Sequence, residues 1–227
     1  MAAGVFGAAA LSLAAISGAA CLSSLYASVA RDVVRHTGGR HDGIEAAQMA
    51  ARLSPWRAAS HTALAQSLSA DNQIDAAAAS ASGAVSAAPA DGYTWAYLAR
   101  VRGASQRADP RLADLYAMAL RRSPNAAPLH WAIAFDGVRR WRMGDDALRS
   151  LWRSSMAYSL RQNRRAFLSQ VARLGRDPYL CATNQSELPI AKWCAQAKVT
   201  RQKCSGSDLP PKAAAWCKNL DIAAPSP

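Results

Sequence analysis

Residues that favour β-strands are scarce in this chain, and acidic residues are outnumbered by basic ones. Aromatic residues make up 7% of the 227 residues, and alanine dominates the composition. Because aromatic and β-branched side chains are the ones enriched in strands, their shortage argues against a sheet. The sequence therefore predicts an all-α protein.

Motifs that carry catalysis are also missing. The chain has no HExxH sequence, no nucleophile elbow and no glycine-rich phosphate loop, and its four histidines are scattered. Asp145 and Asp146 form an acidic pair after Gly144, but this position is typical of a helix N-terminus, where negative charge is favoured. We expect a protein that is not an enzyme and has neither a cofactor nor a metal site.

Charged side chains are absent from residues 1–30. This length exceeds the roughly 20 residues that a helix needs to cross a bilayer, so we predict a transmembrane anchor over 1–30 and a juxtamembrane linker over 31–42. A cleaved secretory signal is an alternative, because residues 28–30 form a small-x-small site, although no basic segment precedes it. Lipid modification of Cys21 is a second alternative.

Small residues recur at every fourth position within this segment, at Ala10, Ala14 and Gly18. Such a row lets two membrane helices approach closely, so these residues are candidates for helix packing in the membrane. An alanine-rich chain also produces rows of this kind by chance.

Three prolines, Pro55, Pro89 and Pro124, lie 34 and 35 residues apart, and each ends a helix-like run of small and apolar residues. Proline cannot donate to the helix ladder and disfavours helix in the residue before it. A period near 34 is typical of stacked helix pairs. An ordinary helical bundle with incidental prolines is the alternative. The expected segments are an unpaired helix at 43–54, helix pairs at about 57–89, 90–124 and 125–158, and a capping helix at 159–176.

The order of certain residues within these windows matches a known repeat pattern. One copy contains Trp95, Leu98, Ala99, Tyr116, Ala119 and Pro124, and the preceding copy contains His61, Leu64, Ala65, Ala84 and Pro89. Residues 43–158 therefore resemble the tetratricopeptide repeat family. The resemblance implies a concave groove, lined by the first helix of each pair, that binds peptides or partner helices. In this register Gln66, Tyr93 and Arg100 would point into the groove.

Positive charge is concentrated in the second half of the chain. From Arg100 to Arg176 there are sixteen arginines and five aspartates, with Trp141 and Trp152 among them. Arginine beside aromatic residues suits anionic glycans or lipid headgroups, although arginine on any solvated helix face gives the same pattern. The residues assigned to this basic face are Arg139, Arg140, Arg142, Arg149 and Arg153.

The tail over 177–227 contains four of the five cysteines, arranged as two C-x12-C units in which tryptophan precedes the second cysteine. Regular spacing in a short segment indicates a disulfide framework. Because the unit is duplicated, we favour bonds between Cys181 and Cys194 and between Cys204 and Cys217. Zinc binding and free thiols are the alternatives, but zinc ribbons normally contain close C-x2-C pairs, which are missing here.

Disulfides require an oxidising compartment and thus place most of the chain outside the cytoplasm, where nucleic acid is not an expected partner. Arg31, Arg35 and Arg40 favour the opposite orientation, because basic residues prefer the cytoplasmic side of a membrane segment. We give the cysteines more weight.

Our hypothesis is a single-pass protein of the bacterial inner membrane with a periplasmic helical-repeat domain. It would serve as a scaffold for protein partners in an envelope complex, such as one for polysaccharide synthesis or export. The alternative is a periplasmic carrier or chaperone that binds an acidic glycan or lipid through its arginine-rich half.

Overall fold

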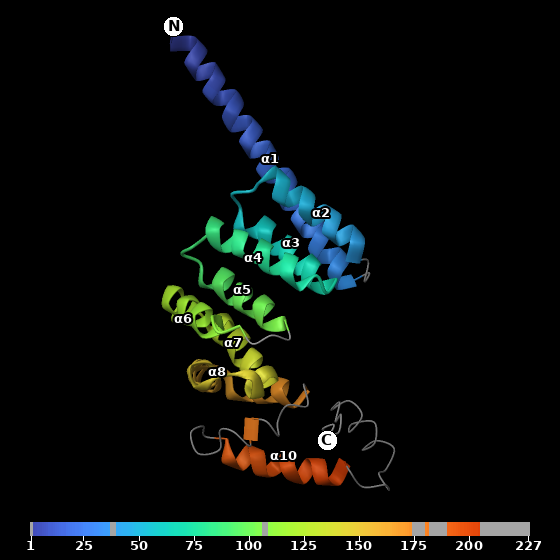
Figure 1. Cartoon of the computed structure of the whole chain (residues 1–227), viewed down its shortest axis with the longest axis vertical. Helices are drawn as coiled ribbons and strands as arrows, with labels where there is room; N and C mark the ends of the chain where they lie inside the picture. The colour runs from blue at the N-terminus through green and yellow to red at the C-terminus, as the bar shows by residue number, and fades with distance from the viewer. Residues whose placement is uncertain (1, 37–39, 106–108, 174–179, 182–189, 205–227) are drawn as a thin grey trace. The chain divides into compact units, whose positions relative to one another are not determined.

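The computed structural model describes residues 2–36, 40–105, 109–173, 180–181 and 190–204 (Figure 1). Within these ranges every regular element is a helix, so the all-α prediction is confirmed. The chain divides into two compact units, unit 1 over Met1–Pro124 and unit 2 over Asn125–Pro227.

Unit 1 is a succession of helix pairs. Its described helices are α1 (Ala2–His36), α2 (Arg40–Leu53), α3 (Ala58–Ala70), α4 (Ile74–Ala87), α5 (Gly92–Ala104) and α6 (Leu112–Arg122). α1 packs on α2, α3 on α4 and α5 on α6, and the second helix of each of the first two pairs also contacts the next helix along the chain. Pro55 and Pro89 lie in the connections between pairs, and Pro124 follows α6.

The second half of α1 belongs to this stack. Ala27 and Ala30 are buried, and α1 contacts α3 as well as α2. The Ser23 hydroxyl, 1% exposed, donates to the Ala50 carbonyl oxygen at 3.0 Å and lies 2.8 Å from the Ser60 Oγ. The helix expected to stand unpaired at 43–54 therefore has α1 as its partner.

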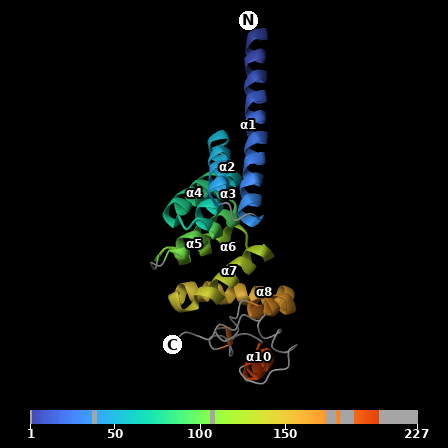
Figure 2. The same cartoon turned by 90° about the vertical axis from the view of Figure 1, so that its right-hand side faces the viewer.

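Helix also occupies most of the linker expected over 31–42. Residues 31–36 continue α1, and residues 40–42 begin α2. Next to this connection, Gly43 is buried against α1, where an added Cβ would lie 3.2 Å from the Val34 Cγ2. α1 and α2 are thus two arms of one helical hairpin. The first part of α1 extends beyond the helices of unit 1 that pack on its second part (Figure 2).

The transmembrane helix expected over residues 1–30 is not supported by the structure. None of the helices in the described part of the chain combines the length and the hydropathy that crossing a membrane requires. Alanine, glycine and serine make up most of this segment, which limits its hydropathy even though α1 is 35 residues long.

Arg57 fastens α1 to the connection between α2 and α3. Its Nη1 donates to the Ala20 carbonyl oxygen at 2.7 Å and to the Ser24 Oγ at 2.8 Å. The buried Ser54 hydroxyl donates to the Ala19 carbonyl oxygen at 3.5 Å. These bonds fix the rotation of α1 about its axis and its position along that axis relative to the connection between α2 and α3.

The interior of unit 1 is built from small residues with a few large ones between them. Ile44, Leu68, Ala77 and Val101 form a buried cluster that takes one residue from each of α2, α3, α4 and α5. At the crossing of α5 and α6, a Cβ added to Gly92 would lie 2.5 Å from the Ala119 carbonyl oxygen. Only glycine allows these two backbones to approach so closely.

Unit 2 contains α7 (Ala127–Arg140), the 3-10 helix η1 (Trp141–Met143), α8 (Asp146–Arg173) and α10 (Ala191–Cys204) among its described elements. The Asp145 Oδ1 accepts a hydrogen bond from the Leu148 amide at 2.8 Å and so caps α8. This confirms that the acidic pair marks a helix N-terminus.

α8 changes direction at Asn163, whose backbone angles of φ −155° and ψ 78° are not helical. The Asn163 Oδ1 accepts from the Ala166 amide at 3.1 Å and caps the second part of the helix. The boundary expected between 158 and 159 therefore lies at 163, and Asn163, rather than a proline, marks it.

Trp152 is the centre of the crossing between α7 and α8 and is 1% exposed. A Cβ added to Gly137 would lie 2.5 Å from the Trp152 Cγ, and one added to Gly144 would lie 2.5 Å from its Cζ3. Two glycines thus make room for one indole ring, and the Cε of the buried Met156 would lie 3.0 Å from the same Cβ added to Gly137.

We predict that Gly137→Ala destabilises unit 2 by about 1–3 kcal/mol, because the added methyl group overpacks the Trp152 site. Thermal unfolding followed by near-ultraviolet circular dichroism measures the loss. Gly18→Ala is the control, since nothing lies within 4 Å of an added Cβ there. Removing that exposed glycine should leave stability equal or raise it by about 0.5–1 kcal/mol. A Gly137→Ala protein as stable as the parent would contradict this packing.

We predict that Ser23→Ala loosens α1 by about 1–2 kcal/mol, because it leaves the Ser60 hydroxyl and the Ala50 carbonyl oxygen without their buried partner. Hydrogen exchange resolved to peptides of α1 and α2 measures the effect. Ser28→Ala is the matched control, because the Ser28 hydroxyl donates to the Leu25 carbonyl oxygen of its own helix at the protein surface. Equal protection in the two variants would show that α1 does not depend on this contact.

Candidate functional site

An aromatic and cationic surface lies on one side of α5. Tyr93, Tyr97 and Arg100 are four and then three residues apart, a spacing that places them on the same face of a helix. We call these three residues the α5 face. Tyr93 is 45% exposed, and the Arg100 guanidinium lies 4.9 Å from the centre of the Tyr97 ring.

Packing against the core and an N-terminal cap hold the α5 face in place. Tyr97 packs against the buried cluster around Leu68 and Val101, so its ring is anchored in the interior. The Asp91 carboxylate caps α5 by accepting from the Tyr93 amide at 2.9 Å. Burial raises the pKa of the Tyr97 hydroxyl, while the neighbouring Arg100 guanidinium acts in the opposite direction. The hydroxyl is therefore protonated at neutral pH.

The three residues predicted for a binding groove lie on two helices that contact each other. Tyr93 and Arg100 share the α5 face, and Gln66 is a partly buried residue of α3. Tyr97 was not among the predicted residues. Tyr97 lies four residues after Tyr93 and three before Arg100, and this helical spacing is the signal that identifies it.

The arginines predicted to form a basic face have different roles in the structure. The Arg140 Nε lies 3.2 Å from the Asp136 Oδ1, and the Asp136 side chain is only 4% exposed. An ion pair this sheltered is a fixed part of the packing of α7. Arg139, next to it, is exposed.

Arg149 and Arg153 also make contacts within unit 2. The Arg149 Nη1 lies 3.6 Å from the Asp146 Oδ1, and its Nε donates to the Trp141 carbonyl oxygen at 3.2 Å. The Arg153 guanidinium lies 6.0 Å from the centre of the Trp141 ring. Arg142 is exposed beside them in η1. Arg140, Arg149 and Arg153 are thus engaged in contacts that organise α7, η1 and α8.

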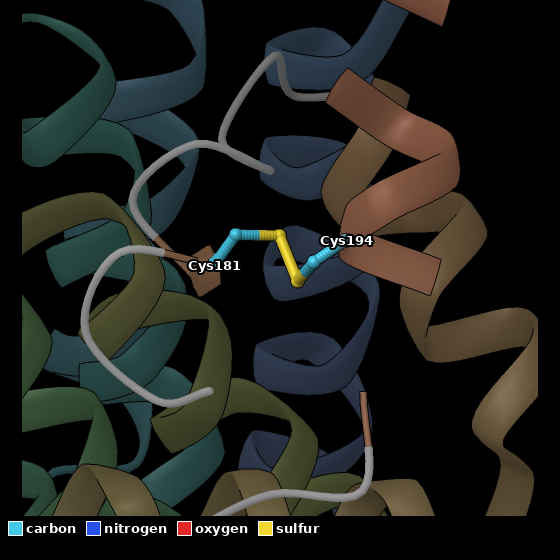
Figure 3. The surroundings of a disulfide bond; sticks show 2 residues. All are labelled: Cys181 and Cys194. Atoms are coloured by element: carbon cyan, nitrogen blue, oxygen red, sulfur yellow. A yellow bond between two sulfur atoms is a disulfide. The ribbon is translucent and has the colours of Figure 1, made fainter. Parts of the chain in front are cut away.

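A disulfide joins Cys181 to Cys194 with a Cα–Cα distance of 5.6 Å (Figure 3), as the spacing of the first C-x12-C unit predicts. It ties the short helical stretch at 180–181 to α10. Leu180, just before Cys181, and Ile190, four residues before Cys194, are both buried. Because two of the four thiols are used in this bond, a zinc site formed by all four thiolates is excluded.

The second pair of cysteines lies largely outside the described part of the chain. Cys204 is the last residue of α10, but its side chain is not described, and Cys217 is outside the described residues. Among the described residues there is no group of three metal-ligating side chains.

The small-residue row is only partly described. Ala10, Ala14 and Gly18 all belong to α1, and the side chains before Ile16 lie outside the described part. Gly18 is exposed and has open space around it. Cys21, one turn further along α1, is an exposed free thiol.

Comparison with protein-family models and with curated proteins gives no match to this chain. We therefore infer function from the positions and contacts of the described residues. The described residues offer an aromatic and cationic helix face in unit 1, and a disulfide-tethered helix beside arginine-rich α8 in unit 2.

We predict that the native protein, treated with iodoacetamide without reductant, is alkylated at Cys21 but yields Cys181 and Cys194 as one linked peptide. Peptide mapping by mass spectrometry reads both outcomes. Replacing Cys181 and Cys194 by serine should destabilise the tail by about 3 kcal/mol, the expected contribution of a loop of this size. Alkylation of Cys181 or Cys194 in the native protein without reductant would contradict the bond.

Proposed function

We propose that this protein is a non-enzymatic scaffold that binds a protein partner through the α5 face and works at the bacterial cell envelope. The observation that carries the proposal is the exposed Tyr93 ring on the same helix face as an arginine that lies over Tyr97. Tyrosine and arginine are enriched among the residues that dominate binding energy at protein interfaces.

The contacts that hold the α5 face in place support a binding role. Tyr97 and Arg100 are already in contact with each other, and α5 is held against α6 by the close approach at Gly92. Side chains that are ordered before binding lose less conformational entropy when a partner docks. Gln66 on α3 offers an amide for hydrogen bonds on the neighbouring helix.

The location is part of the same proposal. The Cys181–Cys194 disulfide favours an oxidising compartment, which in a bacterium is the periplasm. The first part of α1, in a segment without charged residues, is the proposed attachment to the inner membrane. Together these features suit a scaffold that holds a partner at the periplasmic side of that membrane.

The proposal predicts that a photoreactive phenylalanine analogue placed at Tyr93 of the full chain forms one discrete protein adduct in the membrane fraction of the native host. Arg100→Ala should reduce the yield several-fold, because it removes the cation over Tyr97. The matched control is the same analogue at Ala79, an exposed position on α4.

Equal adducts at Tyr93 and Ala79, or none at Tyr93, would contradict binding through the α5 face. An adduct found only in the soluble fraction would contradict the membrane attachment and leave the scaffold role intact.

A further inference from the structure

A cavity of about 490 Å³ lies within unit 2, between the second part of α8 and α10. This volume is within the range of small-molecule sites and exceeds the volume that a single inorganic ion needs. The lining residues are Arg164, Arg165, Leu168, Ser169, Lys192, Trp193 and Gln196.

The charge of the cavity has one sign. Arg164 and Arg165 come from α8 and Lys192 comes from α10, and none of the described residues that line the cavity is acidic. Neither α10 nor the part of α8 after Asn163 contains an aspartate or a glutamate. Within the described part of the chain, none of the three cations forms an ion pair. Three cations that converge on one space repel each other until an anion joins them.

The helix dipole also disfavours the two arginines at their positions in α8. Because α8 breaks at Asn163, the two arginines occupy the first turn of the helical segment that follows. The helix dipole is positive at that end and disfavours cations there. All three side chains are exposed to solvent, which screens their repulsion in the empty protein, and a bound anion would reduce it further.

The remaining lining combines two apolar residues, Leu168 and Trp193, with the polar Ser169 and Gln196. Leu168 is 5% exposed, and the ring of Trp193 is half-buried on α10. The disulfide at Cys194 holds α10 at the residue next to Trp193. A small inorganic anion would engage the cations and leave the two apolar residues uncovered.

We propose that the cavity binds a phosphorylated amphiphile. Its phosphate group lies among Arg164, Arg165 and Lys192, and its apolar chain lies against Leu168 and Trp193. Two guanidinium groups offer paired donors that match phosphate oxygens, and the lysine supplies a third charge. This inference goes beyond the scaffold function and does not depend on it, because it concerns other helices in another unit.

The test is calorimetric titration of the full chain with dodecyl phosphate, kept below its micellar concentration. We expect one molecule to bind per chain. The variant with Arg164→Gln and Arg165→Gln, and separately Lys192→Gln, should each bind at least about tenfold more weakly, because charge-assisted hydrogen bonds are lost. Arg161→Gln is the matched control, since Arg161 is an exposed arginine of the same helix that does not line the cavity.

Two further ligands separate the contributions of the head and the chain. Inorganic phosphate should bind at least about tenfold more weakly than dodecyl phosphate, because it leaves Leu168 and Trp193 in contact with water. Dodecyl maltoside, which has the same chain and no charge, should not compete with dodecyl phosphate. Equal binding of inorganic phosphate, or an equal loss of affinity in Arg161→Gln, would overturn the proposal, as would the absence of saturable binding.

Vesicles distinguish the source of the ligand. Sedimentation with phosphatidate-containing vesicles, compared with neutral phosphatidylcholine vesicles, tests whether the phosphate is presented by a membrane. Recruitment that depends on Arg164 and Arg165 identifies a lipid headgroup. Binding of dodecyl phosphate without recruitment identifies a free amphiphile, and both results agree with the proposed chemistry.

Discussion

Close approach of helix backbones through alanine and glycine is the constraint on which both units depend. Ala50, Ala65, Ala77 and Ala119 have no exposed surface. Gly92 leaves no space for a side chain where its helix meets the next one. When helices lie this close, their contacts are made mostly by backbone and methyl groups. The addition or removal of one carbon atom then changes the stability of the packing. Large residues are then needed only in a few gaps, such as those filled by Trp152 and Leu68.

The turns between helix pairs could be predicted because their cause is local. Proline restricts its own backbone and that of the residue before it, so Pro55, Pro89 and Pro124 mark connections whatever surrounds them. The cap at Asp145 is local in the same way. The break at Asn163 is equally local, because the amide that it caps lies three residues further on, but it was not predicted since asparagine within a helical pattern gives a weak signal.

The place of α1 could not be read from composition. A segment rich in alanine and serine and without charge suits a membrane and suits a tight helix pair equally well. The contacts that place the second half of α1 in a helix pair, from Ser23 to Ala50 and Ser60, join residues 27 and 37 positions apart. Spacing along the chain does not reveal such pairs. The same is true of Arg153 over Trp141, whereas the pairing of Arg140 with Asp136 has the ordinary helical separation of four.

The disulfide also makes the position of α10 depend on the oxidation state of Cys181 and Cys194. α10 contains no acidic residue and is joined covalently to the rest of unit 2 through Cys194. While the chain is in a reducing compartment, its thiols stay reduced, and α10 is held only by buried residues such as Ile190. The geometry of the cationic cavity therefore depends on the oxidation state of these two cysteines, although neither of them lines it.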